Sequence, residues 1–120
     1  MPRLALLIVL SSLIAATAAR TDFADAIFAY DQGDYATTYA ESRPLAEAGV
    51  AEAQYMLGLL YDRGEGIGRD PVRAYLWYRL AAKAGDAFAA KAAASVARRM
   101  NKKQSAAARA LLDDWRPTTD

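Results

Sequence analysis

The 120-residue chain contains no cysteine and no histidine. Without cysteine it can form no disulfide, no thiolate metal site and no lipid-modified cysteine. Without histidine it lacks the commonest metal ligand and the side chain that most often acts as a general base near neutral pH. The Ser-His-Asp and Cys-His arrangements of nucleophilic enzymes are therefore excluded.

Carboxylates remain as candidates for acid–base chemistry, but their spacing does not favour it. Asp113 and Asp114 are adjacent, so on a helix their side chains point about 100° apart. Asp22 and Asp25 are better explained as acids near the start of a helix. We therefore predict no enzymatic activity, no catalytic residue, no metal site and no cofactor.

The only long, largely apolar run lies at the start of the chain. Leu4–Ile14 follows Arg3, and small residues stand at positions 16–19. A positive start, an apolar stretch and small residues at the cleavage position are typical of a secretory signal peptide. We predict that the leader is removed after Ala18 or Ala19.

This leader, residues 1–19, decides the expected compartment. Its apolar part is shorter than the roughly 20 residues that a spanning helix needs. Retention as a membrane anchor is the alternative, but we expect no membrane span in the mature chain. The protein is expected to be exported, periplasmic if its source is a Gram-negative bacterium and otherwise secreted.

Small and aromatic residues follow helical spacing in the middle of the chain. Ala53, Leu57 and Tyr61 fall at i, i+4 and i+8, which predicts a helix over about 50–62. Gly58 lies beside this stripe, where glycine costs roughly 1 kcal/mol relative to alanine. We expect the missing side chain to permit a close approach of the next helix.

Three glycines, Gly64, Gly66 and Gly68, follow this predicted helix. Glycine adopts positive φ without strain, so the cluster is expected to end the helix and form a loop. The cluster lacks the lysine and the preceding strand of a phosphate-binding loop.

A second helix is predicted over about 71–84. Asp70 is a good N-cap, and Pro71 suits the first helical position because its missing N–H would have no partner there. Gly85 is expected to end the helix. The inner face is predicted to consist of small and aromatic residues, namely Ala74, Trp77, Tyr78, Ala81 and Ala82.

Taken together, this stretch resembles a Sel-1-like repeat, an α/α hairpin similar to the tetratricopeptide hairpin but with a longer, glycine-containing loop. The residues that carry the resemblance, and that it implies are structural, are Ala53, Leu57, Gly58, Tyr61, Gly64, Gly66, Asp70, Ala74, Trp77, Tyr78, Ala81, Ala82 and Gly85. The resemblance implies a protein that binds other proteins or peptides.

Partial copies of this unit flank it at an offset of 36 residues. Asp34 matches Asp70 before it, and Ala89 matches Ala53 after it. Self-similarity at a fixed period indicates a stacked repeat. The predicted hairpins span about 21–48, 50–84 and 86–115.

We therefore predict an all-α fold, a short right-handed α/α solenoid of about three antiparallel hairpins and six helices. The repeat domain should span 20–116, with a C-terminal tail at 117–120. The third hairpin is degenerate, since Leu57 becomes Ala93 and Tyr61 becomes Ala97. We interpret it as a terminal cap.

Three local signals refine the helix boundaries. Pro44 should kink or bend the second helix of the first hairpin. Asn101 and Gln104 have the spacing of a capping box at the start of the last helix. Pro117 should end that helix.

Alignment with the tetratricopeptide family implies a concave binding face, formed by the first helix of each hairpin. The residues that the resemblance places on this face are Phe28, Asp31, Glu52, Tyr55, Leu59, Asp62, Phe88, Lys91, Ser95 and Arg98. Each aromatic residue among them can instead be explained by packing alone, and Tyr55 is evenly balanced between packing and contact.

Charge is unevenly distributed along a chain whose net charge is +1. Residues 20–70 carry four basic and ten acidic side chains, whereas residues 71–120 carry ten basic and four acidic ones. Solvated helix faces explain this simply; the alternative is an envelope-associated module that self-associates through its opposed halves. Nucleic acid is not an expected partner, because no dense basic stripe is interleaved with aromatic residues.

Overall fold

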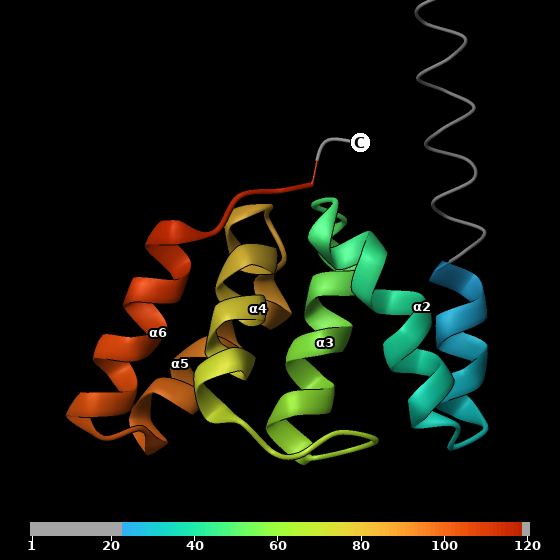
Figure 1. Ribbon diagram of the computed structural model, residues 1–120, viewed down its shortest axis with the longest axis horizontal. Coiled ribbons are helices and arrows are strands. Elements are labelled where there is room, and N and C mark those ends of the chain that lie inside the picture. Colours follow the sequence, from blue (N-terminus) through green and yellow to red (C-terminus); the bar gives the residue numbers. More distant parts are fainter. Residues whose placement is uncertain (1–22, 119–120) are drawn as a thin grey trace, which may run out of the picture.

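The computed structural model describes residues 23–118, and every regular element in this range is a helix. A helical segment over residues 23–31, here called the first helical segment, is followed by α2 (Tyr35–Glu47), α3 (Ala51–Arg63), α4 (Pro71–Lys83), α5 (Ala87–Arg99) and α6 (Lys102–Asp114). Figure 1 shows them as a short stack of roughly aligned helices. The expected all-α repeat architecture is confirmed.

The predicted signal peptide, residues 1–19, lies outside the described residues. Among the helices that the structure describes, none combines the length and the apolar character needed to cross a bilayer.

Side-chain caps fix where several helices begin. Asp70 Oδ1 accepts from the backbone N–H groups of Val72 and Arg73 at 3.0 and 3.1 Å. Both halves of the capping box between Asn101 and Gln104 are present, as predicted. These local signals placed the helix starts within one residue of the observed ones.

Two features of the loops and helices refine the sequence predictions. Gly64 ends α3 in the left-handed conformation at φ 69°, and Gly66 has φ 75°. Gly68 is not among the glycines with positive φ, so only two of the three loop glycines use this freedom. Pro44 lies inside α2, which remains one helix on both sides of the proline.

The central pair, α3 and α4, holds the fold together. α3 packs between α2 and α4, and α4 packs against α3, α5 and α6. Gly58 is covered by the ring of Tyr78, which is the expected close approach of the next helix. The main core cluster joins residues of α2, α3 and α4, including Ala46, Leu57, Leu60, Trp77 and Leu80.

The third pair is less tightly nested than the predicted hairpin. α5 and α6 each pack against α4 rather than closely against one another. A cavity of about 50 Å³ lies between them and is lined by Tyr75, Ala97, Met100, Ser105 and Arg109. Ala97, which lines this cavity, stands where the central unit has the larger Tyr61.

The C-terminal segment folds back over the stack, which the sequence analysis missed. Trp115, just past α6, packs edge-on against Trp77 with ring centroids 6.4 Å apart. Further on, the N–H of Thr118 donates to the carbonyl oxygen of Glu47 at 2.8 Å. In Figure 1 this segment crosses the end of α4 and reaches the end of α2. We call residues 115–118 the strap.

Candidate interaction face

A stripe of α3 is left partly uncovered by its neighbours. The buried residues of this helix are Ala53, Gln54, Met56, Leu57, Gly58 and Leu60. They point toward both sides of the stack, as expected for a helix enclosed by α2 and α4. Of the residues that are not buried, Glu52, Tyr55, Leu59 and Asp62 are spaced three or four apart and form a stripe. Ala51, Tyr61 and Arg63 are the other residues of α3 that are exposed or half-buried. The residues of the stripe are the four that the sequence analysis placed on the binding face in α3.

The first helices of the successive pairs lie side by side and point the same way. Near the ends of α3 and α5, Arg99 Nη2 lies 2.9 Å from Asp62 Oδ1. Earlier in both helices, Tyr55 of α3 and Ala92 of α5 pack against the same buried cluster, which contains Ala93. Because matching positions of the two helices meet, α3 and α5 run parallel.

The end of the first helical segment is tied to the end of α3. Tyr30 OH donates to Glu65 Oε1 at 3.1 Å, and Arg63 Nη1 donates to Tyr30 OH at 3.0 Å. The uncovered stripe of α3 is therefore flanked by the first helical segment and by α5. We call this three-helix surface the interaction face.

Six of the ten residues predicted for this face are exposed and four are half-buried. The exposed residues are Phe28, Asp31, Glu52, Phe88, Lys91 and Arg98, and the half-buried ones are Tyr55, Leu59, Asp62 and Ser95. Phe28 is 67% exposed and Phe88 is 77% exposed. Two phenylalanines so open to water contribute little to the core, so packing does not explain their presence.

Asp62 has an intramolecular role that the sequence did not reveal. Its carboxylate accepts from Arg99 at 2.9 Å and from Tyr78 OH at 3.3 Å. Burial, and then this nearby carboxylate, raise the pKa of Tyr78 above its usual value. Asp62 therefore joins α3, α4 and α5, and its charge is largely balanced within the protein.

Tyr55 both packs and reaches the surface. Its ring centroid lies 5.7 Å from that of Tyr78, with the rings tilted by 41°. The residue is nevertheless only half-buried. The sequence left open whether Tyr55 packs in the core or contacts a partner. The structure is compatible with both, because the ring packs against Tyr78 while the residue stays partly accessible.

Most residues of the repeat motif lie in the interior or at the turns. Ala53, Ala74 and Ala81 are completely buried, and Leu57 and Tyr78 are 1% exposed. Trp77 is also buried, whereas Tyr61 and Ala82 are half-buried. Gly64, Gly66 and Gly85 have positive φ, and Asp70 caps α4. Their positions suit a scaffold that presents the interaction face.

The glycine loop between α3 and α4 also joins successive pairs. A Cβ placed on Gly66 would lie 2.8 Å from Tyr35 Cβ and 2.9 Å from the Tyr35 carbonyl carbon. The loop therefore rests directly on the start of α2. In the same region, the ring centroids of Tyr30 and Tyr35 lie 5.3 Å apart.

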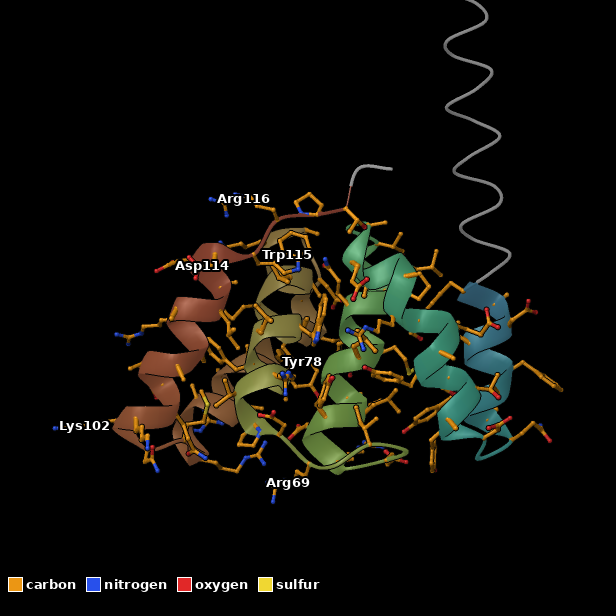
Figure 2. All side chains as sticks on the ribbon, in the orientation of Figure 1. Arg69, Tyr78, Lys102, Asp114, Trp115 and Arg116 are labelled. Carbon is orange, nitrogen blue, oxygen red and sulfur yellow. The ribbon has the colours of Figure 1, made fainter. Side chains whose placement is uncertain are left out.

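A groove of about 550 Å³ lies at the opposite end of the helices, beside the strap. Its lining includes Gln54, Leu80, Lys83, Leu112 and Trp115. Figure 2 shows Trp115 turned toward the stack, whereas Arg116 points away from it. Sequence reasoning missed this groove, because it forms only where the strap crosses the helix ends.

The described residues offer no obvious place for a metal ion. Within 23–118, no group of three or more acidic, cysteine or histidine side chains is arranged to hold one.

The comparison with known families agrees with the repeat motif. The family model of the Sel1 repeat matches residues 51–86. This range contains α3, the glycine loop and α4. This stretch of the chain is therefore a Sel1 repeat, as the repeat motif predicted. Sel1 repeats generally mediate protein–protein interactions and are typically non-catalytic.

Proposed function

We propose that this protein is a non-catalytic adaptor that binds a protein or peptide segment on the interaction face. The observation that carries the proposal is the uncovered stripe of α3, because most other residues of this helix are buried. Exposed Phe28 and Phe88 lie on the two helices that flank this stripe. Aromatic residues in this situation are typical of contact sites for other proteins.

Leu59 offers the cleanest test of this proposal. It is half-buried on the stripe and belongs to neither core cluster. Immobilised synthetic peptides with leucine or phenylalanine at the centre serve as probes. We expect Leu59→Asp to abolish the binding of the peptides that the unmodified protein selects, because a carboxylate would then have to be desolvated at the contact.

The matched control is Leu111→Asp on α6, whose side chain is 42% exposed and lies off the face. This variant should bind as the unmodified protein does. Equal losses in the two variants, or no loss in Leu59→Asp, would show that the contact lies elsewhere. Circular dichroism of both variants verifies that the helices are retained.

We also propose that the protein acts outside the cytoplasm, on the basis of the leader in its sequence. Expression of the full chain in a Gram-negative host, followed by fractionation, tests this. We expect the periplasmic fraction to contain a chain that begins at Ala19 or Arg20. An intact leader in the membrane fraction would favour the anchor instead.

Self-association is the second candidate function, supported by the charges at the two ends of the stack. Residues 23–70 carry more acidic than basic side chains, including exposed Asp25, Asp31 and Glu41. Residues 71–118 carry more basic ones, including exposed Lys102 and Lys103, although α6 also exposes Asp113 and Asp114. Oppositely charged ends can pair head to tail. An oligomer that sediments at low salt and dissociates at high salt would favour this function.

A further inference from the structure

The three helices of the interaction face differ in charge in a regular order. The described part of the first helical segment, residues 23–31, contains Asp25 and Asp31 and no lysine or arginine. In contrast, α5 contains Lys91, Arg98 and Arg99 and no acidic residue. The face therefore has an acidic edge and a basic edge on either side of α3.

Ion pairing within the protein leaves both edges charged. Arg99 is paired with Asp62. Among the described residues, no ion pair involves Asp25 or Asp31 at the acidic edge, and none involves Lys91 or Arg98 at the basic edge. All four side chains are exposed, so their charges are available to a partner.

Apolar side chains lie between and beside these charges. Leu59 and Tyr55 are half-buried on the central helix, and Phe28 lies on the same helical segment as Asp31. A partner that covers the face thus meets carboxylates at one edge, apolar and aromatic groups in the middle, and cations at the other edge.

We propose, building on the function proposed above, that the partner is a bipolar segment. Such a segment has an apolar centre, lysine or arginine at one end and aspartate or glutamate at the other. Its basic end lies over Asp25 and Asp31, and its acidic end lies over Lys91 and Arg98. A segment of uniform charge is repelled at one edge of the face, and for the same reason an anionic lipid surface is a poor partner.

Three synthetic peptides with the same apolar centre test the charge order. One carries a lysine pair and a glutamate pair at its two ends, one carries lysine pairs at both ends, and one carries glutamate pairs at both ends. We expect the bipolar peptide to bind about threefold to tenfold more tightly than either of the others, as a few exposed ion pairs allow. The advantage should shrink at high salt.

The double variant Lys91→Glu and Arg98→Glu locates the basic edge. It should lose the advantage of the bipolar peptide and instead prefer the peptide with lysine at both ends. The matched control is Lys102→Glu with Lys103→Glu, an equal change of charge on exposed residues of α6. This control should keep the original preference.

The outcomes separate this inference from the function on which it rests. Equal binding of the three peptides, abolished by Leu59→Asp, would overturn the charge order but leave the binding face intact. An equal loss in the α6 control would also overturn the charge order, because net charge alone would then explain the preference. Binding unaffected by Leu59→Asp, or no binding at all, would overturn both proposals.

Discussion

The ring of Tyr78 occupies the space where a side chain at position 58 would be. A Cβ built on Gly58 would lie 2.6 Å from Cε1 and 3.0 Å from Cγ of Tyr78. Tyr78 is 1% exposed, and its hydroxyl is tied to Asp62, so the ring has little room to move. This contact sets how closely α3 and α4 approach.

Gly58→Ala should therefore destabilise the protein even though alanine is the better helix former. Overpacking a buried contact costs about 1–3 kcal/mol, which is set against a gain of roughly 1 kcal/mol in helix propensity. We expect a net loss of up to about 2 kcal/mol in urea unfolding. Gly68→Ala is the control, because a Cβ there meets nothing within 4 Å. A stabilised Gly58→Ala variant would show that the two helices can separate freely.

Gly66→Ala tests the contact between the glycine loop and α2. Gly66 and Gly33 have the same φ of 75°, but only at Gly66 would a Cβ meet another segment, namely Tyr35. Both variants carry the cost of about 1–2 kcal/mol for a left-handed alanine. We expect Gly66→Ala to lose about 1–3 kcal/mol more than Gly33→Ala, because of the clash with the backbone. Equal losses of unfolding free energy in the two variants would mean that the left-handed backbone alone explains why glycine stands at position 66.

The strap is expected to contribute to stability. A chain that ends at Asp114 loses the ring contact between Trp115 and Trp77 and the hydrogen bond from Thr118 to Glu47. We expect its free energy of unfolding to fall by about 2–3 kcal/mol, given that Trp115 is half-buried. The control chain ends after Thr118 and retains both contacts. If the two chains unfold at the same urea concentration, the strap only rests on the surface.

Stability should also fall in alkali, and Tyr61 should contribute to the fall. Burial, and then the neighbouring Tyr39 hydroxyl, raise the pKa of Tyr61 to about 12 from its usual value of 10.0. The folded state thus holds this proton more tightly than the unfolded state does. The resulting stabilisation is complete below pH 10 and is lost as the pH rises from 10 to about 12.

Tyr61→Phe should remove this contribution. Its unfolding free energy should fall less steeply than that of the unmodified protein between these pH values, as followed by urea unfolding at several pH values. Parallel curves would show that Tyr61 has the same pKa in both states. The hydroxyl oxygens of Tyr61 and Tyr39 lie 3.5 Å apart, which indicates a weak hydrogen bond. Tyr61→Phe should therefore lower the unfolding free energy only slightly at neutral pH.

The features that the sequence predicted are those encoded locally or by the repeat. Asp70 and Asn101 signal helix starts through side chains that bond within three residues. The stripe of α3 was proposed from the family resemblance alone, and its role in binding stays a prediction. Gly58 could be explained in advance because a glycine inside a helix has a known cost.

The features that sequence reasoning missed depend on contacts between distant segments. No periodic pattern links Trp115 to Trp77 or Thr118 to Glu47, so the strap and its groove were not foreseen. The ion pair between Arg99 and Asp62 was missed for the same reason, since Asp62 was considered only as a surface contact. Ala97 indicated that side-chain volume is missing beside α5. The size of the resulting cavity depends on how Tyr75 of α4 packs there.

Residue-by-residue mapping of the bound bipolar peptide shows whether the interaction face is the binding site. Amide chemical shifts of a chain that spans residues 20–120 are recorded by nuclear magnetic resonance during addition of the peptide. We expect the largest chemical-shift changes at Glu52, Tyr55 and Leu59 of α3, and at Phe28 and Lys91 on the flanking helices. Changes concentrated instead at Lys83 and Trp115, in the groove beside the strap, would contradict this expectation.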